Sequence, residues 1–204
     1  MTRSLVPTDY KCTRLLGFSQ TNQWWQALRA NLTNPGAWEL LWSSGASIEH
    51  FADANDAVWT NSVLDAVGLP VDRAVLNVSG DYISDVSYWV TQINLAIANI
   101  RSKYTNVRMI LLQANVAGPG GALCQNADSI ANANAVDDTI RCCWTNRYIR
   151  SAITAVSRGN VRGGAWCDAL DCAADFEDYI GHLTGSGVID YVGATAGAYY
   201  NAHL

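Results

Sequence analysis

The sequence Arg14-Leu15-Leu16-Gly17-Phe18-Ser19 leads from a short apolar run, through a glycine, into a stretch with helical spacing. Trp24 and Leu28 recur at that spacing, and Asn34-Pro35-Gly36 would end the helix. A sharp turn from a strand into a helix holds its side chain exposed over the carboxyl edge of a sheet. Ser19 is therefore the first candidate functional residue.

The alternation of strand and helix continues along the chain. Apolar runs typical of buried strands recur at residues 38–42, 73–78, 108–116 and 161–166. The clearest helix has apolar residues at steps of three and four from Ile83 to Ile100, with Ser84 or Asp85 near its cap. We expect further helices around residues 149–159 and 188–200, an irregular segment at 50–70 and a surface excursion at 122–139. The pattern predicts one α/β domain over residues 1–204, with three layers and a mainly parallel central sheet.

Four residues lie at or just after the carboxyl ends of candidate strands, and we expect them at one edge of this sheet. They are Ser19, Gly45, Gly80 and Asn115. In open parallel sheets, ligands bind beyond the carboxyl ends of the strands. The sequence therefore predicts a binding or catalytic site at this edge.

The last quarter of the chain carries the segment Asp178-Tyr179-Ile180-Gly181-His182. A serine hydroxyl is a poor nucleophile until a positioned base takes its proton, and a carboxylate orients that base. His182 is the candidate base for Ser19. Asp178 is the candidate acid because it lies nearest, with Asp175 and Glu177 as alternatives. The structural alternative is that Ser19 only caps a helix and His182 is a hydrogen-bonded structural histidine.

This order of residues resembles the SGNH (GDSL-like) hydrolase superfamily over nearly the whole chain. The Gly-Asp-Ser block of that family matches residues 16–21, with Phe18 in place of the usual acid. Gly45 matches the glycine after the second strand. The Asp-x-x-His block is matched with one extra residue, since Asp178 precedes His182 by four positions. The resemblance implies a flavodoxin-like α/β/α fold and a Ser19–His182–Asp178 triad, with Gly45 as a backbone oxyanion donor.

The family's Gly-x-Asn-Asp block is the poorest match. Asp81 stands where the family has an asparagine that donates its side-chain amide to the oxyanion. An ionised aspartate only accepts hydrogen bonds and would repel a developing negative charge. We consider three alternatives: the Gly80 backbone amide donates instead, Asn115 donates from the next loop, or Asp81 faces elsewhere.

These residues predict a serine esterase that hydrolyses short-chain, above all acetyl, esters of small molecules or carbohydrates through an acyl-enzyme. Trp24 lies one helical turn from Ser19 and is our candidate for the wall of a substrate groove. No cofactor or metal is expected. Two alternatives stay open: a non-catalytic carbohydrate-binding domain on the same scaffold, and an O-acyltransferase.

Composition narrows the partners and the compartment. A net charge of −5 without a basic stripe argues against nucleic acid, and no apolar run approaches the roughly 20 residues that span a bilayer. We expect a monomer. The six cysteines favour disulfides, Cys167 with Cys172 and Cys124 with Cys142 or Cys143, although buried thiols are the alternative. Residues 1–12 are no signal peptide, so we expect a secreted or periplasmic protein whose leader has been removed, or a cytoplasmic one.

Overall fold

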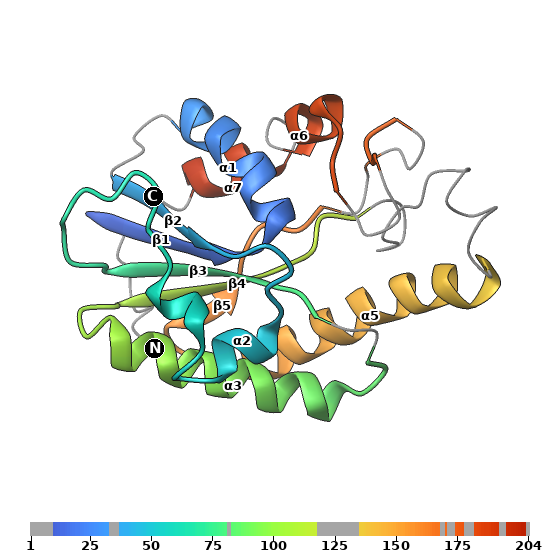
Figure 1. Ribbon diagram of the computed structural model, residues 1–204, viewed down its shortest axis with the longest axis horizontal. Coiled ribbons are helices and arrows are strands. Elements are labelled where there is room, and N and C mark those ends of the chain that lie inside the picture. Colours follow the sequence, from blue (N-terminus) through green and yellow to red (C-terminus); the bar gives the residue numbers. More distant parts are fainter. Residues whose placement is uncertain are drawn as a thin grey trace, which may run out of the picture.

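A five-stranded, fully parallel sheet forms the centre of the computed structural model (Figure 1). Its strand order is β2-β1-β3-β4-β5. The strands are β1 (Cys12–Gly17), β2 (Ala37–Trp42), β3 (Arg73–Val78), β4 (Met109–Ala114) and β5 (Val161–Gly163). The structure describes residues 10–32, 37–80, 83–117, 135–167, 170, 174–177, 182–191 and 195–202, with the backbone alone at 135–145 and 190.

Helices cover both faces of the sheet (Figure 1). On one face lie α1 (Ser19–Asn31), α6 (Gly185–Tyr191) and α7 (Gly197–Ala202). On the other lie α2 (Ile48–Ala52), α3 (Val86–Lys103) and α5 (Ala135–Val156), with the short 3₁₀ helix η1 (Ala57–Thr60) following α2. The order 2-1-3-4-5 is that of flavodoxin-like sheets. The expected three-layer α/β/α fold is therefore confirmed.

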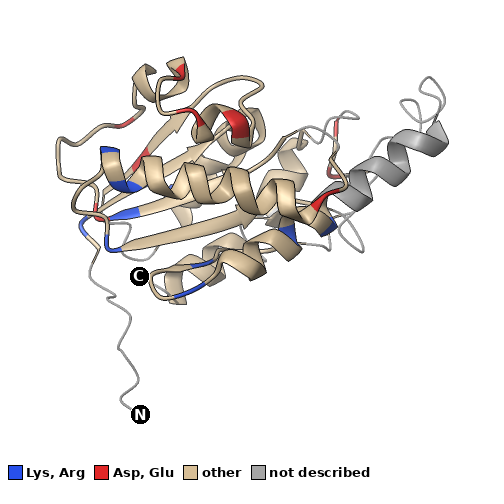
Figure 2. Cartoon of the chain, turned by 90° about the horizontal axis from the view of Figure 1, so that it is seen from below, with Lys and Arg blue, Asp and Glu red and all other residues tan. Residues whose placement is uncertain are grey.

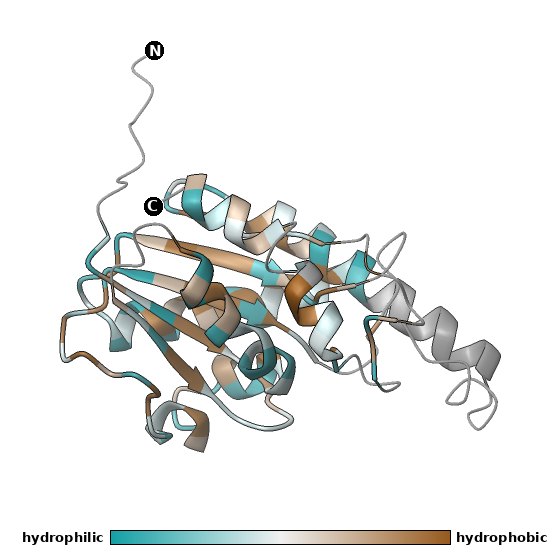
Figure 3. Cartoon of the chain, turned by 90° about the horizontal axis from the view of Figure 1, so that it is seen from above, coloured by the Kyte–Doolittle hydropathy of each residue, from teal (hydrophilic) through white to brown (hydrophobic). Residues whose placement is uncertain are grey.

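Burial explains why the strands form where they do. Every residue of β3 and of β4 is buried, as expected for central parallel strands covered on both faces. One apolar core packs under α3 and α5 and includes Leu76, Trp89 and Ile93. The other packs under α1, α6 and α7 and includes Leu15, Trp24 and Tyr191; we call it the α1-side core. Figure 3 shows the apolar strands between helices of mixed hydropathy.

Several boundaries differ from the expectation. The helix expected from Ile83 begins at Val86, because the Asp85 carboxylate accepts from Ser87 N at 2.8 Å and caps it. The last expected strand ends at Gly163, and the expected helix at 188–200 is two helices, α6 and α7. Residues 50–70 contain the end of α2 and all of η1.

The expected excursion at 122–139 falls largely outside the described residues, and α5 already begins at Ala135. Among the helices that the structure describes, none has the length and apolarity needed to cross a membrane.

Candidate active site

The Ser19 hydroxyl oxygen lies 2.7 Å from Nε2 of His182, although the two residues are 163 positions apart in the chain. β1 ends at Gly17, Phe18 is the extended N-cap residue, and Ser19 is the first residue of α1. A first-turn backbone N–H has no partner within its own helix. Ser19 therefore combines a hydroxyl in contact with an imidazole and a position at the positive end of the α1 dipole.

Gly17 makes the turn before Ser19 possible. A Cβ at this position would lie 2.1 Å from the hydroxyl oxygen of Thr21, so no larger residue fits without a shift. That hydroxyl accepts a hydrogen bond of 3.2 Å from the backbone N–H of Phe18 and another of 2.8 Å from the side-chain amide of Asn77. Strand β3 thus holds the first turn of α1 directly against the end of β1.

His182 is carried by a short antiparallel pair of segments. Phe176 and Leu183 form an isolated β-bridge, flanked by hydrogen bonds from Glu177 N to His182 O and from Thr184 N to Asp175 O, each 2.9 Å. Phe176 and Leu183 are also buried in the α1-side core. The imidazole is therefore placed by packed backbone and not by a free loop.

The acid of the expected triad is not settled by this geometry. Asp178 lies outside the described residues. Of the alternatives, Asp175 is 3% exposed, whereas Glu177 is exposed and accepts from Gln23 Nε2 at 3.0 Å. The choice of Asp178 stays a prediction.

The glycines expected to help bind an oxyanion lie at the carboxyl edge of the sheet. Gly45, in the turn after β2, has a φ of +69°, which favours glycine over residues with a side chain. The same turn is tied to the nucleophile segment because Ser43 N donates to Gly17 O at 3.3 Å. Gly80 follows β3, and a Cβ there would lie 2.8 Å from the Trp89 ring. Asp81 lies outside the described residues.

Asn115 follows β4 and is 5% exposed. Its side-chain oxygen is buried and has no hydrogen-bond partner in the part of the chain that the structure describes. The next residue, Val116, is bound through both its N–H (3.0 Å) and its carbonyl (3.3 Å) by the side chain of Gln20. Because Gln20 adjoins Ser19, this clamp joins the end of β4 to the first turn of α1.

Trp24, the tryptophan expected to line a substrate groove, does not reach the surface. Trp24 is fully buried and packs edge-to-face on Tyr191, so the expectation that it contacts substrate is wrong. Among the tryptophan side chains that the structure describes, Trp166 alone is exposed, at 42%. It follows β5, and the Arg150 guanidinium lies over its ring. Its place just after a strand was the signal that pointed to the carboxyl edge.

Two cysteines are free, buried thiols: Cys12 and Cys167. The expected disulfide between Cys167 and Cys172 is therefore wrong, and Cys167 instead packs as a small apolar residue in the α1-side core. Burial, with a smaller contribution from the nearby Glu39 carboxylate, raises the pKa of the Cys12 thiol to about 12. The side chains of Cys124, Cys142, Cys143 and Cys172 lie outside what the structure describes.

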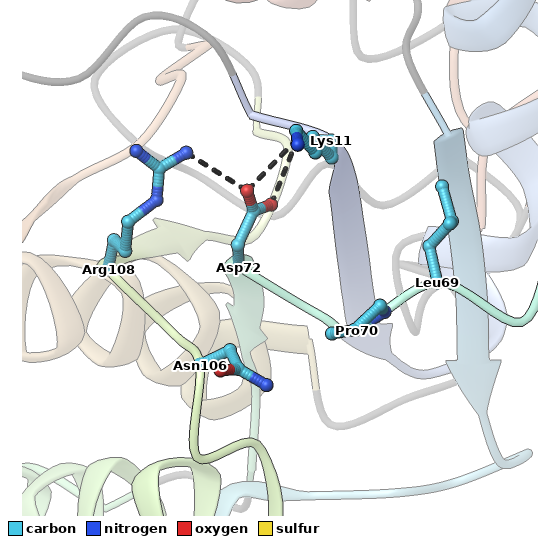
Figure 4. A pocket seen from close by; sticks show the side chains of 6 residues that line it. All are labelled: Lys11, Leu69, Pro70, Asp72, Asn106 and Arg108. Carbon is cyan, nitrogen blue, oxygen red and sulfur yellow. Dashed lines mark hydrogen bonds and ion pairs between the residues drawn. The ribbon is translucent and has the colours of Figure 1, made fainter.

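A pocket of about 530 Å³ lies at the opposite, amino edge of the sheet (Figure 4). Its lining is Lys11, Leu69, Pro70, Asp72, Asn106 and Arg108. The Asp72 carboxylate accepts from the backbone N–H groups of Lys11 and Cys12 and from the Arg108 guanidinium. Figure 2 shows basic residues where the strands begin. Because parallel strands carry Ser19 at their other end, this pocket is separate from the candidate active site.

Within the described residues, no three His, Cys, Asp or Glu side chains gather in a group that could hold a metal ion.

Comparison with known proteins identifies the fold. No family model and no curated protein matches the sequence. A candidate SGNH hydrolase from Slackia heliotrinireducens matches with a TM-score of 0.57 and 11% identity, over 96% of this chain and 99% of that one.

Two further solved structures are similar. The periplasmic domain of a lipopolysaccharide acetyltransferase from Salmonella ser. Paratyphi A has a TM-score of 0.56 and 14% identity, over 93% of this chain and 83% of that one. A catalytic mutant of an acetylxylan esterase from Geobacillus stearothermophilus has a TM-score of 0.51 and 10% identity, over 93% and 94%. The chain therefore has the fold of the SGNH hydrolases, as its sequence resemblance predicted.

Proposed function

We propose that this protein is a serine esterase that hydrolyses short-chain acyl esters. The observation that carries the proposal is the 2.7 Å contact between the Ser19 hydroxyl and the His182 imidazole. Nucleophile and base within about 2.6–3.2 Å of each other are the geometric signature of an activated serine. Their position at the carboxyl edge, beside the switch point between β1 and β3, is where open α/β sheets bind ligands.

The proposed reaction begins when Ser19 Oγ attacks the ester carbonyl carbon while His182 Nε2 takes the hydroxyl proton. The oxyanion is held by the backbone N–H groups of Ser19 and Gly45, with Gly80 or Asn115 as a further donor. The attack forms a tetrahedral intermediate. Its collapse breaks the ester C–O bond, and His182 returns the proton to the leaving alcohol. His182 next deprotonates a water that attacks the acyl-enzyme, which releases the carboxylic acid and restores Ser19. Asp178 would hold the imidazole tautomer.

We propose acetylated carbohydrates as the substrate class. The support is the exposed indole of Trp166, whose segment adjoins the site: Ala117 N donates to Cys167 O, and Gln20 clamps the neighbouring Val116. An aromatic face at the rim of an active site suits the apolar face of a sugar ring. By their names, the Salmonella protein is a lipopolysaccharide acetyltransferase and the Geobacillus protein is an acetylxylan esterase, so both names refer to acetyl groups on carbohydrates, which supports this proposal.

A panel of nitrophenyl esters of increasing acyl length tests the proposal. We expect the wild type to hydrolyse acetyl and other short esters and to react covalently with a fluorophosphonate at Ser19. Ser19→Ala should abolish both while circular dichroism stays unchanged. Ser102→Ala, on the exposed side of α3, is the matched control and should behave as the wild type. A wild type that is inert in both assays would refute the esterase and favour the non-catalytic carbohydrate-binding domain.

The same acyl-enzyme serves the alternative O-acyltransferase, in which a sugar hydroxyl replaces water. Adding xylo-oligosaccharides to the assay separates the two reactions. Free acetate as the main product supports the esterase, and acetylated oligosaccharide as the main product supports the transferase.

A further inference from the structure

Gln23 joins the helix that carries Ser19 to the segment that carries His182. Its side-chain oxygen accepts from the Leu183 backbone N–H at 2.9 Å, and its side-chain nitrogen donates to the Leu183 carbonyl at 3.2 Å. The same nitrogen donates to the Glu177 carboxylate at 3.0 Å. One amide therefore binds both backbone groups of the residue next to His182.

The backbone pattern of the 175–184 segment explains why this amide matters. In the bridge between Phe176 and Leu183, the flanking hydrogen bonds use Glu177 N, His182 O and Thr184 N. The N–H and carbonyl of Leu183 point away from that pairing, as in any such antiparallel arrangement. If these two groups of Leu183 had no hydrogen-bond partner in their partly buried position, the folded state would lose stability. The Gln23 amide takes the place of a neighbouring strand for this single residue.

Helix geometry aligns the two contacts. Ser19 and Gln23 are four positions apart in α1 and so lie on the same face of the helix. Likewise, His182 and Leu183 are adjacent on the opposing segment. The two segments are therefore joined by a second contact, one helical turn from the contact between the Ser19 hydroxyl and the His182 imidazole.

We propose that Gln23 is a positioning residue for the serine–histidine pair, an inference that rests on the esterase function proposed above. Gln23 does not itself touch the reacting atoms in this assignment. It fixes the His182 segment on α1, so that Nε2 stays within hydrogen-bond distance of Ser19 Oγ. Displacing a catalytic group by about 1 Å can cost about 100-fold in rate.

The test compares three variants with the wild type. Gln23→Met keeps the length and removes all three hydrogen bonds. Gln23→Glu keeps the shape and the acceptor for Leu183 N–H but removes both donations, and it places a carboxylate beside Glu177. Gln26→Met is the matched control on the same helix, because Gln26 contacts Asp65 at the surface and not the His182 segment.

Two readouts are needed, one kinetic and one independent of catalysis. For Gln23→Met we expect kcat for nitrophenyl acetate to fall about 10- to 100-fold with KM within twofold, and fluorophosphonate labelling of Ser19 to slow by a similar factor. In Gln23→Glu, kcat and the labelling rate should fall at least as far. Amide hydrogen exchange at Leu183 should accelerate at least about tenfold in Gln23→Met, while exchange at Glu177 changes less. Gln26→Met should match the wild type in both readouts.

The possible results separate this inference from the proposed function. Faster exchange at Leu183 with unchanged kcat would overturn the positioning role and leave a structural clamp. Unchanged exchange would overturn the clamp itself. If the wild type neither hydrolyses esters nor reacts with the fluorophosphonate, the esterase proposal fails and the positioning role with it, and exchange at Leu183 still decides whether the clamp exists. If Gln23→Met does not fold, Gln23→Glu gives the kinetic comparison alone, because it keeps the acceptor for the Leu183 N–H, and a kcat equal to that of the wild type then overturns the positioning role.

Discussion

The side-chain amide of Asn77 donates a hydrogen bond of 2.8 Å to the hydroxyl oxygen of Thr21. Asn77 lies in the buried strand β3, and Thr21 lies in the first turn of α1, two residues after Ser19. The same hydroxyl accepts from the Phe18 backbone N–H, and the Ser19 N–H, in the first turn, has no acceptor within α1 itself. The position of the nucleophile therefore depends on a buried polar contact between β3 and α1.

Replacing Thr21 with valine should destabilise the protein and lower its activity. Valine has the same shape but leaves the Phe18 N–H and the Asn77 amide buried without an acceptor, which we expect to cost about 1–3 kcal/mol. Urea unfolding measures the loss. Thr91→Val makes the same change on the exposed side of α3 and should cost far less. Equal losses for the two variants would contradict the role of the Thr21 hydroxyl.

Gly17→Ala should be at least as damaging, for a steric reason. The added methyl would lie within 2.1–2.7 Å of the Oγ1, Cβ and Cγ2 atoms of Thr21, so α1 must move away from β1. Overpacking of this kind costs about 1–3 kcal/mol, and here it also displaces Ser19 from His182. Thermal unfolding and ester hydrolysis measure the two effects. Gly185→Ala, where a Cβ meets open space, is the control. A fully active Gly17→Ala protein would refute this account of the turn.

The parts of the fold that follow from buried periodicity could be predicted from the sequence. The bounds expected for β3, residues 73–78, are confirmed, because a central parallel strand is a nearly continuous apolar run, here interrupted only by Asn77 after Arg73. The apolar spacing begins at Ile83, before the helix itself, but Asp85, one of the two expected cap residues, does cap α3. One helix was predicted where the structure has α6 and α7, because the small residues of this segment give little periodic signal.

The candidate site was predictable where residue type alone limits the chemistry. Ser19 and His182 were paired because few residue types can serve as nucleophile and base. The contacts of Gln20 and Gln23 could not be predicted from the sequence, because a glutamine whose side chain binds backbone groups cannot be told from a surface glutamine there. The expectation that Trp24 lines a groove failed because only the packing of α1 on the sheet decides whether its indole is buried.

The stability of the protein should depend on the ionisation of Asp72 at the amino edge of the sheet. Burial alone would raise the pKa of this carboxyl, but hydrogen bonds from the N–H groups of Cys12 and Lys11 and from Arg108 outweigh it and lower the pKa. A carboxyl whose pKa is lowered by folding stabilises the native state above its unfolded pKa of about 3.9, and this contribution is lost as the pH falls through the native value.

We therefore expect Asp72→Asn to be less stable than the wild type at pH 7 by about 1–3 kcal/mol, with the difference shrinking below about pH 4. Urea unfolding between pH 2.5 and 8 measures it. Asp65→Asn removes an exposed carboxylate that pairs with Arg29 and should cost less than about 1 kcal/mol. A difference that does not change with pH would show that the Asp72 contacts do not require its charge.

The exposed indole of Trp166 provides the test of the proposed substrate class. Trp166 is 42% exposed and follows β5 at the edge that carries Ser19, and the Arg150 guanidinium lies over its ring. Trp166→Ala should raise KM for an acetylated xylo-oligosaccharide about tenfold, equivalent to about 1.4 kcal/mol, and leave KM for nitrophenyl acetate unchanged, because the small ester does not extend to the indole. Trp166→Phe should recover part of this increase in KM. Leu95→Ala, which truncates an exposed apolar side chain on α3, should change KM for neither substrate.

An equal increase in KM for both esters would instead show that Trp166 supports the structure of the site. Unchanged KM for both would contradict carbohydrate stacking on Trp166.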